Sequence, residues 1–206
     1  MTRMQADSDN DRWGRAAAAP ADTGTTPLHL AAGCGDSVAV ANLLADGIDG
    51  ETPDSLGNTP LHYAAIAGMA ASVKLLIASG CHPCPLNHRG ETPLHAAAMF
   101  GRIHAIEAII AGGADPEACD YENQTPLHHA TLGGHANAVR MLLKAGCDPD
   151  SLDLNQRSPL HLAAAGLHLE CLDTLLAAGA DDTARDIGGH TPLALAEAAQ
   201  AAADLH

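Results

Sequence analysis

The chain has 206 residues, of which 25 are acidic and 10 are basic, and its formal net charge is −15. Phosphate binding requires an excess of Lys and Arg, and base stacking requires aromatic rings, which make up only 2% of this chain. The composition therefore argues against a nucleic-acid-binding protein, and the same acidity disfavours docking on anionic membranes.

The first 21 residues are predicted to form a mobile N-terminal leader. They begin with MTRMQADSDNDRW, which is acidic and polar and lacks the basic and apolar regions of a secretory signal. No run of 18 apolar residues occurs, so we expect no transmembrane helix and no membrane partner. The expected location is the cytoplasm, or also the nucleus in a eukaryote, where the six Cys residues would be reduced.

From residue 22 onward one tetrapeptide recurs in strict register. Thr-Pro-Leu-His stands at 26–29 and returns every 33 residues, at 59–62, 92–95 and 125–128. It continues as Ser-Pro-Leu-His at 158–161 and as Thr-Pro-Leu-Ala at 191–194. A fixed period of this length indicates stacked repeats, because one such unit cannot bury its apolar face alone.

Each unit is predicted to contain two helices followed by a loop. Thr caps a helix and Pro suits its first turn, so the first helix of unit 1 should begin at Thr26 and Pro27 and end at Gly35. A second helix, carrying the apolar pair at 43–44, should end at Gly47. A loop or hairpin rich in Asp, Gly, Pro and Asn then leads to the next unit.

This pattern, T-P-L-H-x-A-A-x-x-G with a second Gly-terminated helix, resembles the ankyrin repeat. The similarity covers residues 22–206, as units 22–54, 55–87, 88–120, 121–153, 154–186 and 187–206. The resemblance implies an all-α solenoid of stacked helix pairs with hairpin finger loops. It also implies a non-catalytic adaptor, scaffold or inhibitor that binds another protein through the fingers and first helices. The repeated His would hydrogen-bond the local turn together with its Thr.

The last two units depart from the pattern. In unit 5, Leu167 stands where earlier units have Gly and Gly166 sits one residue early, which predicts an altered turn. Unit 6 has Ala194 in place of His and Gln200 in place of Gly, so Ala194–Leu205 is expected to form a single Ala-rich helix. The C-terminal face would then be weakly capped, and self-assembly through it is the alternative to a monomeric adaptor.

The candidate binding surface comes from the variable positions of the pattern. Large apolar and aromatic side chains dominate binding hot spots, and Tyr121 lies at the tip of a finger. Acids gather in the finger regions, Glu117 and Asp150 among them, and they favour a protein partner with a basic segment, although they equally suit solvated loops. The variable positions of units 2 to 5 carry Tyr63, Ile66, Met99, Phe100, Leu132 and Leu162.

One segment offers metal-ligand chemistry. Cys81 and Cys84 form a Cys-x-x-Cys with His82 and His88 nearby, a spacing that suits half of a zinc site. Two prolines restrict this loop and no second half-site exists, so a metal or redox role here is a minor alternative. The sequence contains no nucleophile elbow, P-loop or His-Glu-x-x-His, so we expect no enzyme, no catalytic residue, no cofactor and no metal.

Overall fold

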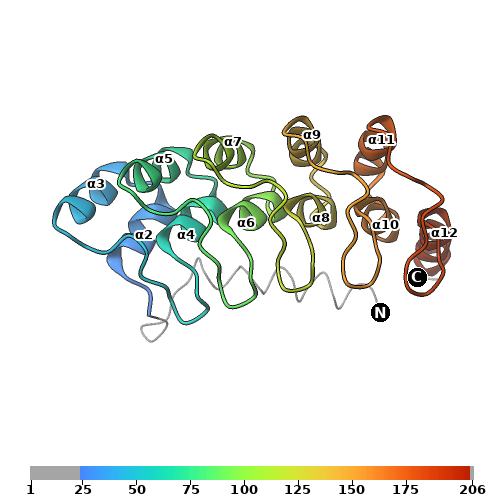
Figure 1. Cartoon of the computed structure of the whole chain (residues 1–206), viewed down its shortest axis with the longest axis horizontal. Helices are drawn as coiled ribbons and strands as arrows, with labels where there is room; N and C mark the ends of the chain where they lie inside the picture. The colour runs from blue at the N-terminus through green and yellow to red at the C-terminus, as the bar shows by residue number, and fades with distance from the viewer. Residues whose placement is uncertain (1–23, 205–206) are drawn as a thin grey trace.

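A computed structural model describes residues 24–204, and the predicted leader at 1–21 lies outside this range. The described residues form helices and loops without strands, and the helices stand in two rows (Figure 1). One row contains α2 (Pro27–Cys34), α4 (Pro60–Ala67), α6 (Pro93–Met99), α8 (Pro126–Leu132), α10 (Pro159–Ala165) and α12 (Pro192–Ala203). The other row contains α3 (Ser37–Ala45), α5 (Ala70–Ala78), α7 (Ile103–Ala111), α9 (Ala136–Lys144) and α11 (Leu169–Ala177). The fold is therefore the expected all-α solenoid of stacked helix pairs.

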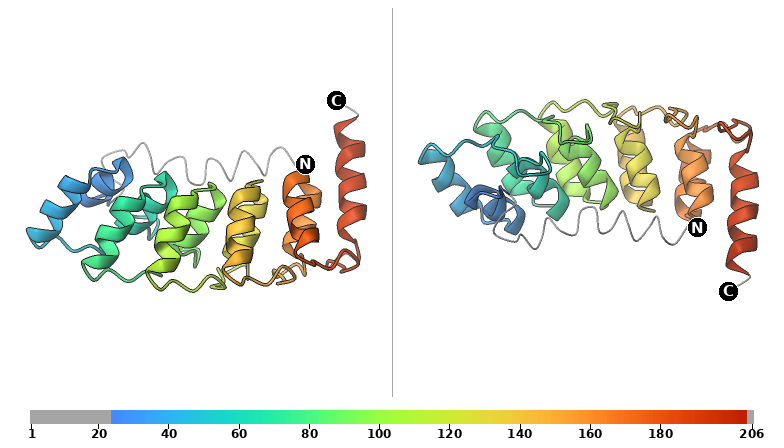
Figure 2. Two further views of the ribbon diagram at one scale, coloured as in Figure 1. Left: turned by 90° about the horizontal axis from the view of Figure 1, so that it is seen from above. Right: turned by 90° about the horizontal axis from the view of Figure 1, so that it is seen from below.

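The core runs the length of the stack rather than forming one central cluster. Each helix packs against its counterpart in the next unit, so that α2 contacts α4 and α3 contacts α5, and the views from above and below show this side-by-side order (Figure 2). The Leu of each of the first five tetrapeptides is fully buried, and it is joined by one apolar residue from most second helices. These residues are Leu28, Leu61, Leu94, Leu127 and Leu160, with Leu76, Ile109, Leu142 and Leu175.

The repeated His joins each unit to the next. The backbone N–H of Thr26 donates to Nδ1 of His29 at 3.1 Å, so the ring proton lies on Nε2, which donates to the carbonyl of Asn58 at 3.0 Å. The other four repeated His residues make the same pair of bonds, each reaching a carbonyl 29 residues ahead at 3.0–3.2 Å. The local turn bond expected from the resemblance is confirmed, and the bond to the next unit adds to it.

The turn of unit 5 keeps the shape of the others, so the expectation of an altered turn is wrong. Leu167 adopts a left-handed backbone with φ 54°, in the range of the glycines that occupy this position elsewhere. The chain therefore tolerates a conformation that costs an L-residue roughly 1–2 kcal/mol. Those glycines have φ between 62° and 79° and are Gly35, Gly68, Gly101 and Gly134.

The last unit contains a single helix, as its Ala-rich sequence predicts. This helix, α12, runs for 12 residues from Pro192 to Ala203 and packs against α10. None of the described helices is long and apolar enough to cross a membrane.

Candidate functional site

The finger loops lie edge to edge because backbone hydrogen bonds connect them. The N–H of Tyr121 donates to the carbonyl of Arg89 at 3.1 Å, and Leu154 and Ile187 make the same bond one and two fingers later, at 3.0 and 2.9 Å. Residues 33 apart therefore stand in a row across successive fingers. In this row Tyr121, Leu154 and Ile187 are 68%, 64% and 76% exposed.

A second row of apolar side chains runs beside the first. Within each of the first four fingers a buried polar residue separates two exposed ones, as buried Asp153 separates Leu152 from Leu154. Alternate residues of an extended segment point to the same side, so the flanking residues form one surface. We call this the fingertip surface, and its large exposed apolar members are Leu86, Tyr121, Leu152, Leu154 and Ile187.

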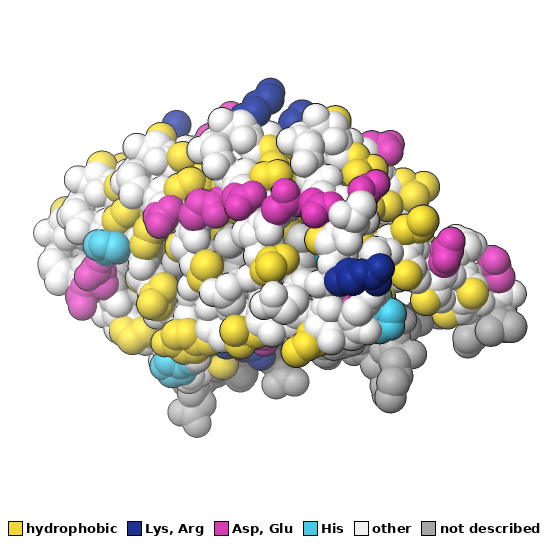
Figure 3. Space-filling model, turned by 45° about the vertical axis from the view of Figure 1, so that its right-hand side comes forward, with side chains coloured by type: hydrophobic (Ala, Val, Ile, Leu, Met, Phe, Trp, Pro, Cys, Tyr) yellow, Lys and Arg dark blue, Asp and Glu magenta, His cyan; other side chains and the backbone are white. Residues whose placement is uncertain are grey.

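A row of acidic side chains borders the fingertip surface (Figure 3). Adjacent fingers interlock here, because Oε1 of Glu117 accepts the N–H of Asp148 at 2.9 Å and Oδ1 of Asp150 accepts the N–H of Asp181 at 2.8 Å. Hydrogen bonds from Thr183, by its side chain and its backbone, lower the pKa of the exposed Asp181 carboxyl. We call the acidic residues connected by these bonds and by two bonds within the fingers the acidic row, which comprises Asp115, Glu117, Asp148, Asp150 and Asp181.

Half of the predicted first-helix surface lies in the interior. The expectation that Tyr63, Met99 and Leu162 are exposed is wrong, since they are only 6%, 7% and 4% exposed. Close stacking of the first helices covers these positions. The remaining members, Ile66, Phe100 and Leu132, are half-buried against the core.

Tyr63 shows why a variable position can be a core position. Its hydroxyl donates to Oδ2 of Asp54 at 2.9 Å, and its ring meets the His29 ring edge-on at 5.0 Å. Burial, together with the neighbouring Asp54 carboxylate, raises the pKa of the Tyr63 hydroxyl. The side chain therefore ties a finger to its helix instead of presenting an aromatic face to a partner.

In the part of the chain that the structure describes, Cys81, His82, Cys84 and His88 do not come together as a group of metal ligands. Cys81 is buried, and burial followed by the charges of Glu51 and Asp49 raises the pKa of its thiol. A thiol that resists ionisation is a poor metal ligand and a poor redox nucleophile. This environment gives no support to the zinc or redox alternative at this loop.

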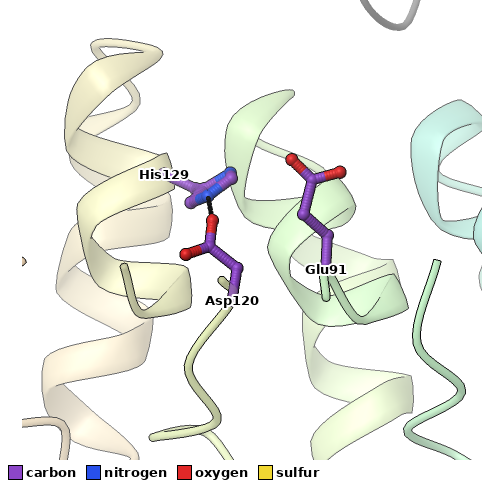
Figure 4. A group of neighbouring side chains, drawn as sticks. All are labelled: Glu91, Asp120 and His129. Atoms are coloured by element: carbon purple, nitrogen blue, oxygen red, sulfur yellow. Dashed lines mark hydrogen bonds and ion pairs between the residues drawn. The ribbon is translucent and has the colours of Figure 1, made fainter. Parts of the chain in front are cut away.

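A different group of metal-ligating side chains does meet, between units 3 and 4. One ligand atom each of Glu91, Asp120 and His129 lies within 4.8 Å of the others, and all three residues are buried (Figure 4). Nε2 of His129 is 3.0 Å from Oδ2 of Asp120. Burial alone would raise the pKa of Asp120, but hydrogen bonds from His129 and the backbone of Gln124 outweigh it and lower the pKa.

The sequence interpretation missed Leu154 and Ile187 on the fingertips and missed the buried group. The first omission was avoidable, because residues 121, 154 and 187 are one period apart and all apolar. Glu91, Asp120 and His129 follow no motif spacing, since they come from the two segments before α6 and α8 and from α8 itself (Figure 4). No local pattern in the sequence places these three together.

Comparison with known families agrees with the geometry. The family described as ankyrin repeats (3 copies) matches residues 9–87 and 72–153, and the family described as ankyrin repeats (many copies) matches residues 145–196. No curated protein matches the chain. Ankyrin repeats are generally protein–protein interaction modules and are typically non-catalytic. With matches over most of its length and two rows of stacked helices, the chain belongs to the ankyrin-repeat family.

Proposed function

We propose that this chain recognises a protein partner by binding a segment of it along the fingertip surface. The observation that supports this most directly is the row of Tyr121, Leu154 and Ile187, three highly exposed apolar side chains on successive fingers. Contiguous apolar patches are uncommon on monomeric proteins and mark interaction sites. Tyr is moreover among the residues enriched in binding hot spots.

The acidic row indicates the chemistry of the partner segment. Glu117 and Asp150 lie on the fingers that carry Tyr121 and Leu154, so a bound segment would meet apolar contacts on one side and carboxylates on the other. A segment that places Lys or Arg beside Leu, Ile or aromatic residues complements both. The charges would accelerate the encounter, and the apolar contacts would slow dissociation.

The half-buried side chains of the first helices extend this surface toward the solenoid. Ile66, Phe100 and Leu132 keep part of their area open to solvent and lie on three successive units. A partner that fills the angle between fingers and helices would contact them in addition to Tyr121. Tyr63, Met99 and Leu162 would contribute only by holding the helices together.

The experiment is a peptide-display selection against the chain, followed by binding measurements on the selected peptides. The test variant carries Tyr121→Ser, Leu154→Ser and Ile187→Ser together. The matched control carries Ser in place of three apolar side chains of similar exposure that lie elsewhere. These are Val38, Leu169 and Leu193, which are 71%, 68% and 66% exposed. We expect peptides with mixed basic and apolar residues whose affinity falls at least tenfold in the test variant and is unchanged in the control.

Two results would contradict the proposal. One is a set of selected peptides that bind the test variant as tightly as the wild type. The other is a selection that yields no peptide with Lys or Arg beside apolar residues. As a separate check on the acidic row, Glu117→Gln with Asp150→Asn should slow association and weaken its dependence on salt concentration, with little change in dissociation.

A further inference from the structure

The buried group between units 3 and 4 brings together two carboxyl groups that cannot bond to each other while both are ionised. Glu91 and Asp120 are 1% and 6% exposed, and their ligand oxygens lie within 4.8 Å of each other. Like charges at this separation repel strongly in a buried environment, because little water is present to screen them. The arrangement therefore favours a proton or a cation shared between the two groups.

The 33-residue period places Asn58 and Asn87 at the positions of Glu91 and Asp120 one unit earlier, and Gln124 and Asp153 at these positions one unit later. One unit earlier, Nδ2 of Asn87 donates to Oδ1 of Asn58 at 3.2 Å. One unit later, Nε2 of Gln124 is placed to donate to Oδ2 of Asp153 at 3.5 Å. In both contacts a side-chain amide faces an acceptor, whereas the contact between units 3 and 4 sets one carboxyl against another.

His129 adds a nitrogen ligand to the two carboxyl groups. The residue is fully buried, its Nε2 bonds to Asp120, and its Nδ1 has no hydrogen-bond partner. The close-up shows the His129 ring bonded to Asp120, with the carboxyl group of Glu91 to one side of them on the neighbouring loop (Figure 4). Two carboxylates and one imidazole form a donor set that suits divalent transition metals such as Zn²⁺ and Mn²⁺.

We propose that Glu91, Asp120 and His129 form a binding site for a divalent transition metal ion that links units 3 and 4. One oxygen from each carboxylate and one ring nitrogen of His129 would hold the ion. Two carboxylates balance the charge of a divalent cation, so binding would remove their mutual repulsion. The site would stabilise the stack internally, since all three side chains are buried.

Asp120 is anchored in a way that suits a ligand. Its Oδ1 accepts the backbone N–H groups of Glu122 and Gln124, both at 2.9 Å, which leaves Oδ2 directed to His129. Oε2 of Glu91 accepts from Nδ2 of Asn87 at 2.8 Å. Such outer hydrogen bonds orient carboxylate ligands in metal sites.

The test measures Zn²⁺ binding and the thermal unfolding of the full-length chain. The protein is first stripped of metal, then unfolded and refolded in the presence of Zn²⁺, because the ion must reach a buried site. Free Cys and other His residues will bind some zinc, so the readout is the difference from Glu91→Gln, which recreates the Gln–Asp contact of the next unit. The matched control is Glu107→Gln, which changes an exposed Glu on α7. We expect the wild type and the control to bind about one equivalent more zinc than Glu91→Gln and to show a zinc-dependent rise in Tm that this variant lacks.

Two outcomes would overturn the proposal. If wild type and Glu91→Gln bind equal amounts of zinc with equal shifts in Tm, the site does not bind the ion. If Glu91→Gln unfolds at a higher temperature than wild type, and zinc and Mn²⁺ shift neither protein, the carboxyl groups share a proton instead. A second variant, His129→Phe, removes a different ligand, so that the conclusion does not depend on the Gln introduced at position 91. If the absorption spectrum of bound Co²⁺ is the same in His129→Phe as in the wild type, His129 is not a ligand.

Discussion

Acidification is expected to destabilise the solenoid well above the pH at which its carboxylates titrate. Burial lowers the pKa of His62 to about 4, of His95 to about 3 and of His128 to about 4, from an ordinary value of 6.5. As the pH falls through 6.5, the unfolded chain takes up protons that the folded chain excludes. Stability is therefore fully present above about pH 7 and declines as the pH falls toward 4.

The size of this loss follows from the separation between pH and the unfolded pKa. At pH 5 the pKa of an unfolded His, 6.5, lies 1.5 units above the pH. Each unit corresponds to about 1.36 kcal/mol, so each of the three His residues lowers the free energy of unfolding by about 2 kcal/mol. Together they remove about 6 kcal/mol, a large part of the roughly 5–15 kcal/mol that stabilises a typical domain. The neighbouring carboxylates Asp120 and Asp153 have lowered pKa values as well, so their contribution is lost only at more acidic pH.

Urea unfolding followed by circular dichroism at several pH values between 7.5 and 5 measures this effect. Replacing one buried His, as in His95→Gln, should reduce the slope of unfolding free energy against pH by nearly one proton, whatever it does to stability at pH 7.5. The control His104→Gln changes an exposed His on α7 and should leave the slope as it is. A stability that stays constant from pH 7.5 to 5, or a slope that His104→Gln lowers as much as His95→Gln, would refute the reasoning.

Three further substitutions test individual features of the fold by urea unfolding at pH 7.5. Gln156→Gly should stabilise the chain by about 1 kcal/mol, because exposed Gln156 has φ 58° where most other units carry Gly, and an unchanged midpoint would contradict this. Tyr63→Phe should lower the free energy of unfolding by about 1.5–3 kcal/mol, because it removes the hydrogen bond to buried Asp54, and it should leave peptide binding intact. Weakened peptide binding would show that Tyr63 contacts the partner after all. Asp36→Ala should cost about 1 kcal/mol through loss of the α3 cap to Ala39, and equal stability would show that the cap is dispensable.

The sequence alone was sufficient for the fold because the repeat states the same local signals many times. Thr or Ser and Pro mark each first helix, and a buried Leu follows them in the first five units. Leu167 shows that one missing Gly does not change the turn when the surrounding unit fixes the backbone. The identity of the exposed face was harder to predict. A position that varies between repeats can be open or covered, and the tetrapeptide pattern does not say which: Tyr63, four residues after its Thr, is covered, whereas Phe100, eight residues after its Thr, is half open.

The buried group marks a second limit of sequence interpretation. Asp120 and His129 are nine residues apart and Glu91 belongs to the previous finger, so their proximity depends on the stacking of two units. The fingertip surface has the opposite character, since the 33-residue period alone predicts that 121, 154 and 187 align once the fingers are known to bond edge to edge.

The bonds from each His to the following unit also determine how the stack would respond to a pulling force. Each of these hydrogen bonds connects two consecutive units, and the last of them runs from Nε2 of His161 to the carbonyl of His190 at 3.2 Å. In the last unit Ala194 occupies the position of the repeated His, and its side chain cannot make this hydrogen bond. Tension applied at the α12 end would therefore peel units one at a time, each 33-residue unit releasing roughly 110–120 Å of chain. Such stepwise release would make the protein an extensible tether instead of a unit that ruptures at once.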